Sequence, residues 1–363
     1  MTNSFSSYWR DLANGRRTET VDKLLILIMA PFSLGYSFIQ RLRALFYKTG
    51  ILRSQRLPRP VISIGNITVG GTGKTPVTAY IARQLLQQGY RVAVLSRGYG
   101  GSLEGQSIVV SDGATLMLSP RECGDEPYLL ASTIPGLMVV IGTDRHAAGL
   151  LAMQQLAPDV FLLDDGFQHL RLQRDLNILL VDYSHPYGNG WTLPAGLLRE
   201  PVSAGKRADL IIRTRCPDGI LNKAMTTGIP NCNARHRIVD LLPLSGGDPT
   251  PLPCSTQLKA LAFAGIAEPS AFFDELRSLG LELVHTIRFS DHTSYADDEV
   301  SGILVAMGQY GAEVAITTEK DGVKLKGLTH DLRCRIQLAR MELVINDPSP
   351  LMNALRNLLQ KNS

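Results

Sequence analysis

The segment GNITVGGTGKTP at residues 65–76 has the composition of a loop that binds phosphate groups. Its glycines let backbone amides approach anionic oxygens closely, ahead of a helix N-terminus that favours negative charge. Lys74 can reach the terminal phosphates of a nucleotide, and the Thr75 hydroxyl can bind Mg²⁺. The strict pattern G-x-x-x-x-G-K-[ST] asks for glycine where Thr68 stands, but the backbone mechanism does not depend on that glycine. The residues expected to hold the nucleotide are Thr68, Val69, Gly70, Gly71, Thr72, Gly73, Lys74 and Thr75.

The elements expected on either side of this loop support a nucleotide site. PVISIG (60–65) is a short apolar run typical of a strand, and VTAYIARQLLQQG (77–89) has the spacing of a helix that stops at a glycine. A glycine-rich turn that binds nothing is the alternative, which the order strand, loop, Lys-Thr and helix disfavours. The dinucleotide fingerprint G-x-G-x-x-G fits less well, because Pro76 takes the place of its third glycine.

Two adjacent carboxylates follow a second apolar strand, in VFLLDDGFQH (160–169). Phosphate-loop enzymes hold Mg²⁺ through a carboxylate at the end of such a strand. Because the ends of parallel strands gather at one edge of a sheet, we expect Asp164 and Asp165 to face Lys74 and Thr75. An acidic turn without a metal is the alternative, and the phosphate loop makes it less favoured.

Transfer of a phosphoryl group to an alcohol also profits from a base that accepts the hydroxyl proton. Asp125 in RECGDEP and His292 in RFSDHTSY are candidates for this base. A single Asp or His in a loop is more commonly a solvated surface residue. The residue types alone therefore do not select these two.

Around these motifs, continuous apolar strands alternate with amphipathic helices, which predicts an α/β fold with a doubly wound, mainly parallel sheet. A helix is expected to begin within RECGDEPYLLAST (121–133). A second, smaller α/β lobe is expected after a stretch rich in Pro, Gly, Ser and Thr. The expected division is an N-terminal segment (1–56), a nucleotide-binding domain (57–230), a connector (231–257) and the second lobe (258–363).

The composition of the chain disfavours several classes of protein. The chain has 363 residues, of which 44% are hydrophobic and 19% charged, and this excludes wholesale disorder. Its net charge of +4 is too small to argue for nucleic acid as the main partner, and no obligate protein partner is predicted. The five cysteines form no C-x-x-C pair, which favours unpaired thiols over a disulfide or zinc framework.

The N-terminal run LLILIMAPFSLGYSFI (24–39) carries no charge and is flanked by cations. It is shorter than the roughly 20 apolar residues of a spanning helix. An apolar segment between basic residues is typical of a helix at an anionic membrane surface. A helix buried against the sheet is the alternative.

Seven motifs occur in the order found in the tetraacyldisaccharide 4'-kinases of lipid A synthesis, which this chain resembles between about residue 60 and about residue 325. They are GNITVGGTGKTP, SRGYG, GDEP, DDGFQH, LPAGLLREP, FSDHT and TTEKD. The resemblance extends to the N-terminal apolar segment and the two lobes. It implies an ATP- and Mg²⁺-dependent kinase at the cytoplasmic face of a Gram-negative inner membrane. Such an enzyme would phosphorylate the 4'-hydroxyl of an acylated glucosamine disaccharide 1-phosphate, giving lipid IVA.

The resemblance also implies roles for individual residues. Asp125 would be the base-type aspartate, assisted by His292, with Lys74 on the phosphates. Asp164 and Asp165, with Thr75, would form the metal site. The residues implied near the acceptor are Arg97, Tyr99, His169, Arg199 and Glu200.

Two other functions use the same loop. A regulatory GTPase should carry [NT]-K-x-D to recognise guanine, whereas TTEKD places Lys320 and Asp321 side by side. A non-catalytic, membrane-bound ATP sensor would bind nucleotide but tolerate replacement of Asp125 and His292.

Overall fold

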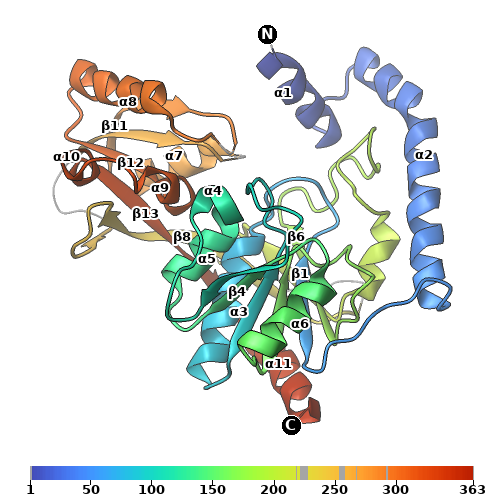
Figure 1. Cartoon of the computed structure of the whole chain (residues 1–363). Coiled ribbons are helices and arrows are strands. Elements are labelled where there is room, and N and C mark those ends of the chain that lie inside the picture. Colours follow the sequence, from blue (N-terminus) through green and yellow to red (C-terminus); the bar gives the residue numbers. More distant parts are fainter. Residues whose placement is uncertain are drawn as a thin grey trace.

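Two α/β lobes and a separate pair of N-terminal helices make up the computed structural model (Figure 1). The structure describes residues 2–217, 219–220, 228–252, 258–266, 268–291 and 293–362. This arrangement confirms the expected fold class.

The first lobe has a sheet whose strands are parallel except at one edge. In spatial order the strands are β3 (Ile108–Asp112), β4 (Met138–Ile141), β2 (Val92–Ser96), β5 (Val160–Asp164), β1 (Val61–Gly65), β6 (Leu176–Asp182) and β7 (Leu210–Thr214). Helix α3 (Lys74–Gln87) and helix α5 (Asp125–Thr133) pack on one face, and α6 (Arg145–Gln155) packs on the other. Because both faces are covered, strands β1, β2 and β5 are buried along their whole length and consist mostly of apolar residues.

The second lobe repeats this layering on a smaller scale. Its strands are β10 (Lys259–Ala264), β11 (Glu282–Arg288), β12 (Val314–Thr318) and β13 (Ile336–Ile345). Helix α7 (Pro269–Ser278) covers one face, while α8 (Asp297–Tyr310) and the short α10 (His330–Cys334) cover the other. The short α9 (Glu319–Gly322) and the 3₁₀ turn η2 (Val323–Leu325) follow β12 and face the first lobe at α5.

The two lobes share one continuous sheet, because a single long strand belongs to both. Strand β8 (Asn231–Pro243) begins parallel to β7 and then runs antiparallel to β13. The segment expected as a connector is thus largely a strand, extended by a short pairing with β9 (Thr250–Pro251). Residues 253–257 lie outside the described part of the chain.

The last helix, α11 (Ser349–Asn362), follows the second lobe in sequence but packs in the core of the first. Its Leu351 and Leu355 are fully buried there, in the same cluster as Ile212 and Cys232. The chain therefore returns to the first lobe after β13, whereas the sequence placed everything after residue 258 in the second lobe.

The helix expected to begin within residues 121–133 is α5, and a glycine separates it from a short preceding turn of helix. Gly124 separates α4 (Pro120–Cys123) from α5 with φ 90° and ψ 157°, a conformation that L-residues rarely adopt. A Cβ at this position would also lie 2.6 Å from the backbone oxygen of Tyr99. The break makes Asp125 the first residue of α5.

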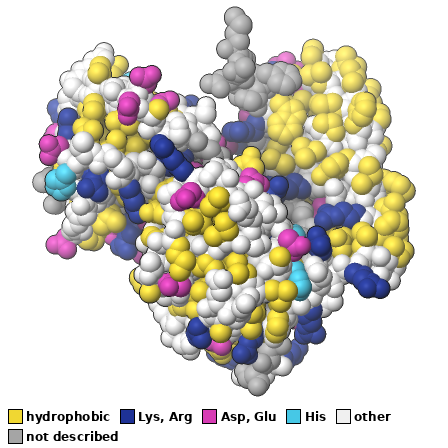
Figure 2. Space-filling view, in the orientation of Figure 1, with side chains coloured by type: hydrophobic (Ala, Val, Ile, Leu, Met, Phe, Trp, Pro, Cys, Tyr) yellow, Lys and Arg dark blue, Asp and Glu magenta, His cyan; other side chains and the backbone are white. Residues whose placement is uncertain are grey.

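Helix α2 (Thr20–Lys48) has its polar side toward the protein and its apolar side outward. Ser33 and Ser37 hydrogen-bond Thr192 on the inner side, at 2.9 Å and 2.8 Å. Figure 2 shows the apolar side chains gathered along the outer side of this helix. The most exposed are Val21, Leu24, Leu27, Ile28, Phe32, Leu34, Phe38 and Ile39. The helix is longer than the apolar run in the sequence, and by length and composition it could cross a membrane.

Candidate active site

The glycine loop lies where strand β1 ends and helix α3 begins. Gly73 adopts a left-handed conformation with φ 78°, and the helix starts at Lys74. A Cβ on Gly73 would lie 2.6 Å from the His236 ring of strand β8, so only glycine fits. The helix N-terminus and the loop amides are therefore placed as a phosphate site requires.

The paired carboxylates lie beside this loop, as the strand order predicts. Asp164 is directly opposite Ile64 in the pairing of β5 with β1. The Lys74 ammonium is 3.7 Å from Oδ1 of Asp165, which adopts a left-handed conformation with φ 52°. A non-glycine residue in this conformation is uncommon and frequently marks a functional site.

The two carboxylates have opposite electrostatic environments. Burial, reinforced by the charges of Glu126 and Asp165, raises the pKa of Asp164 to about 7, and its Oδ1 accepts a hydrogen bond from Thr78 at 3.1 Å. The pKa of Asp165 is lowered, because Lys74 and Arg199 together outweigh the effect of its burial. Arg199 donates to Oδ2 of Asp165 at 2.9 Å.

Arg199 is held in place by backbone pairing with the glycine loop. The amide of Arg199 donates to the carbonyl of Ile67, and the amide of Val69 donates to the carbonyl of Leu197, both at 2.7 Å. The LREP segment (198–201) is thereby fixed against the start of the glycine loop. This pairing explains how two motifs distant in sequence come together.

Asp125 lies between the two lobes. Its Oδ2 is 3.1 Å from the ammonium of Lys324, which belongs to the second lobe and also lies 3.6 Å from Asp321. The neighbouring Lys320 of TTEKD lies 4.0 Å from Glu126 and 3.2 Å from Asp291. These ion pairs place the first turn of α5 against the second lobe. His292, the residue predicted to assist Asp125, lies outside the described residues.

The residues predicted near the acceptor lie in different surroundings. The SRGYG loop of Arg97 and Tyr99 packs its backbone against Gly124, and the exposed Arg97 pairs with Glu104 at 3.0 Å. His169 is part-buried, and burial together with nearby guanidinium groups lowers its pKa to about 4. Glu200 faces away from the acids and pairs with Arg207 at 2.7 Å.

Three residues at this edge of the sheet were missed by sequence reasoning. Arg145 is buried after β4, and burial lowers its pKa to about 10 against the opposing effect of the charges of Asp164 and Asp165. Arg215 follows β7 and donates to the carbonyl of Gly71 at 2.5 Å. His236 touches the loop from β8. A cation within a few residues of the end of a predicted parallel strand was an available signal for both arginines, whereas nothing marked His236.

The residues at the carboxyl edge fit a divalent cation together with nucleotide phosphates. Oδ1 of Asp165 and the hydroxyl of Thr72 are buried atoms without a hydrogen-bond partner. A cation would also favour the ionised form of Asp164, which burial disfavours. Oxygen donors of this kind are those that Mg²⁺ prefers.

Comparison with known proteins identifies the family. The sequence model of the family described as Tetraacyldisaccharide-1-P 4'-kinase matches residues 25–360. The chain belongs to this family. The tetraacyldisaccharide 4'-kinase of Pelobacter propionicus is 60% identical over 361 residues, covering 99% of this chain and 100% of the relative. That of Geobacter sulfurreducens is 52% identical over 98% of this chain and 100% of the relative.

A solved member of the tetraacyldisaccharide-1-P 4'-kinase family has the same fold. The crystal structure of the "apo" form of LpxK from Aquifex aeolicus in complex with ATP matches with a TM-score of 0.78 and 34% identity, over 92% of this chain and 99% of that one. These matches confirm the resemblance seen in the motifs. Membership in a kinase family disfavours both the regulatory GTPase and the non-catalytic sensor.

Proposed function

We propose that this protein transfers the γ-phosphate of ATP to the 4'-hydroxyl of a tetraacylated glucosamine disaccharide 1-phosphate, giving lipid IVA. The observation that carries the proposal is the meeting of the glycine loop, Lys74, the two aspartates and Arg199 at one edge of the sheet, in a chain of this family. The cationic groups lie where charge develops on a transferring phosphoryl group.

Different residues bind the phosphates, accept the proton and contact the acceptor. Loop amides and Lys74 hold the β- and γ-phosphates, and Arg199 orients Asp165 beside them. Asp125, assisted by His292, accepts the proton of the sugar hydroxyl. Arg97, Tyr99 and His169 contact the acceptor. Because Asp125 contacts the second lobe, the spacing of the lobes sets the position of this base.

Incubation of the purified protein with γ-labelled ATP and the disaccharide lipid tests this function. We expect label on the sugar at the 4' position, with unlabelled ATP competing far better than GTP. Labelled inorganic phosphate without labelled lipid would contradict the kinase assignment. Equal competition by GTP would contradict the assigned nucleotide.

When bound, Mg²⁺ would supply positive charge that offsets the charge of the nucleotide phosphates. We propose that Thr75, Asp164 and Asp165 hold it. Replacing Asp164 with asparagine should raise the Mg²⁺ concentration for half-maximal rate roughly tenfold or more, since even residues that only orient metal ligands contribute that much. The matched control is Asp274→Asn, an exposed aspartate of the second lobe that pairs with Arg277. An unchanged Mg²⁺ titration would remove Asp164 from the metal site.

We further propose that α2 attaches the protein to the inner membrane, with the active site facing the cytoplasm. The outward apolar side supports this, because a four-chain acceptor leaves a bilayer only at high cost, about 0.8 kcal/mol per buried CH₂. An enzyme attached to the membrane needs to lift only the sugar head of its acceptor.

The triple variant Leu27→Gln, Phe32→Gln, Phe38→Gln tests the attachment. Each apolar side chain contributes about 1.5–3 kcal/mol when fully buried, so affinity for vesicles in a flotation assay should fall by about a hundredfold or more. The control triple, Leu116→Gln, Met117→Gln, Val305→Gln, removes exposed apolar side chains elsewhere. Equal flotation of both triples would exclude α2 as the anchor.

A further inference from the structure

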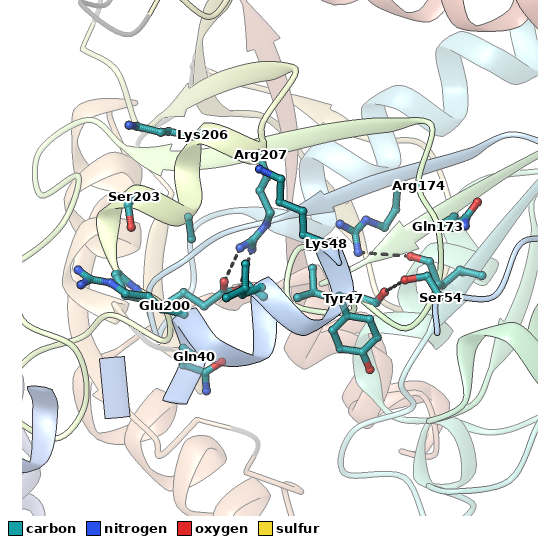
Figure 3. Close-up of a pocket in the computed structure, with 17 residues that line it drawn as sticks. Gln40, Tyr47, Lys48, Ser54, Gln173, Arg174, Glu200, Ser203, Lys206 and Arg207 are labelled. Carbon is teal, nitrogen blue, oxygen red and sulfur yellow. Dashed lines mark hydrogen bonds and ion pairs between the residues drawn. The ribbon is translucent and has the colours of Figure 1, made fainter. Parts of the chain in front are cut away.

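A pocket of about 730 Å³ lies behind the C-terminal half of α2 (Figure 3). Its walls are α2, the loop at residues 170–174 and the 3₁₀ turn η1 (Val202–Arg207). The volume is within the range of small-molecule sites, about 300–1,000 Å³. Among the described residues, none to which we assign catalysis or metal binding lines it.

The pocket carries an excess of positive charge. Glu200 is the one acidic side chain among the described lining residues. It is already bound by Arg207, whose two terminal nitrogens lie 2.7 Å and 3.0 Å from the carboxylate oxygens. Figure 3 shows the Lys48 side chain beside Arg207, whereas Lys206, on the same turn η1, points away from Arg207. The cations that line the pocket are Arg41, Lys48, Arg174, Lys206 and Arg207.

The two inner guanidinium groups are fixed and partly desolvated. Arg174 donates to the carbonyls of His169 and Leu172 at 2.8 Å and 3.3 Å, and burial together with the charge of Arg207 lowers its pKa to about 10. The Nε of Arg207 is buried and has no hydrogen-bond partner. An anion in the pocket would relieve the repulsion between these groups.

The rest of the lining combines apolar and polar side chains. Ala44, Leu170, Leu172 and Pro201 are apolar, and the polar ones are Gln40, Tyr47, Ser54, Gln173 and Ser203. Leu45 lines the pocket and is also half-exposed on α2. The pocket is therefore in contact with the helix whose outer side is apolar. A ligand that combines a negative head with hydrocarbon chains matches both features.

The pocket and the catalytic edge lie on opposite sides of one short segment. Arg199 turns toward Asp165, while the next residue, Glu200, turns toward Arg207 and the pocket. A ligand in the pocket is thus separated from the acids by the LREP backbone. This arrangement favours a ligand other than the acceptor.

We propose that the pocket binds the phosphate headgroup of an anionic bilayer phospholipid, with the acyl chains lying along the apolar side of α2. This inference rests on the proposed attachment of α2 to the membrane. The site would fix how the protein sits on the bilayer, because one headgroup held between α2 and η1, by Lys48 and the inner guanidinium groups, defines the rotation of α2 about its axis.

Titration with monomeric short-chain phosphatidylglycerol, followed by calorimetry without ATP or acceptor, tests the site. We expect saturable binding to one site. The double variant Lys48→Gln, Lys206→Gln removes two exposed cations and should weaken it about fivefold for each one lost. The control Arg53→Gln, Arg59→Gln removes two exposed cations outside the pocket and should bind like wild type. Equal weakening in both doubles would overturn the proposal.

Competing ligands distinguish the sources of the anion. Short-chain phosphatidylcholine binding as tightly as phosphatidylglycerol would overturn the requirement for net negative charge. Displacement by equimolar inorganic phosphate would identify a free-anion site, and displacement by the disaccharide 1-phosphate would identify an acceptor site; either result overturns the proposal. Kinase activity in neutral detergent should survive in the Lys48→Gln, Lys206→Gln variant, so a failure here is separate from a failure of the proposed function.

Discussion

Replacing Lys74 with alanine should lower kcat by about two to three orders of magnitude, the loss found when one group that stabilises transition-state charge is removed. Lys74 is the first residue of α3, and its ammonium is the cation nearest the glycine loop on that helix. Its ammonium pairs with the carboxylate of Asp165, which Arg199 also neutralises.

The folding stability of the Lys74→Ala variant should change little. A partly exposed ion pair contributes about 0–1 kcal/mol, and Asp165 keeps Arg199. The measurements are kcat, ATP affinity and Tm, with Lys259→Ala as a control at an exposed lysine of the second lobe. A variant with near-normal kcat would overturn the phosphate-loop assignment.

The second large effect concerns Asp125. Replacing it with asparagine should lower kcat by about 10²–10⁴-fold, the usual contribution of a general base, while ATP affinity stays near normal. The position of this carboxylate between the lobes adds a sharper test, because Lys324 is a buried cation 3.1 Å away on the other lobe. Asp321 and the ring of Tyr295 also face Lys324.

Replacing Lys324 with methionine should move the acidic limb of the pH–kcat profile to higher pH. A carboxylate that loses its ammonium partner binds a proton more readily, so the active, ionised base is lost at a higher pH. Lys324→Arg should restore the wild-type profile in large part, and Lys320→Met, at the neighbouring ion pairs, should leave it in place. Lower kcat at an unchanged pH profile would assign Lys324 a purely structural role. Wild-type kcat in Asp125→Asn would remove Asp125 from the mechanism.

His292 can be tested from the sequence prediction alone. If it acts with Asp125 as a unit, the double alanine variant should be little slower than the slower single variant. Fully multiplicative losses would show that the two side chains act independently.

Most strands and long helices could be predicted from the sequence, because buried parallel strands produce apolar runs that local composition reveals. The glycine loop and the paired aspartates could be placed at one edge by topology alone. The break at Gly124 was not predictable, since it follows from the close approach of the SRGYG backbone. Asp165 faces Arg199, and Glu200 faces Arg207. These orientations likewise depend on the tertiary pairing of the LREP segment (198–201).

The extent of β8 and the position of α11 were beyond the reach of local patterns. Residues 231–257 are rich in Pro, Gly, Ser and Thr, which predicts a connector. The strand conformation of residues 231–243 depends on pairing with β13, about a hundred residues later. The amphipathic pattern of α11 predicts a helix but does not say which lobe it covers. Contacts so distant in sequence leave no periodicity for a local reading to detect.

The return of α11 to the first lobe has a consequence during synthesis of the chain. Domains generally fold as units while the ribosome is still adding residues, beginning with the N-terminal one. Here the core around Ile212 and Cys232 includes Leu351, Leu355 and Leu358, which are made only after the second lobe. The nascent first lobe therefore has an uncovered apolar surface until the second lobe and then α11 have been translated. A stop codon just before α11 would leave the glycine loop and the paired aspartates in the product. The protein would nevertheless be prone to aggregation and proteolysis.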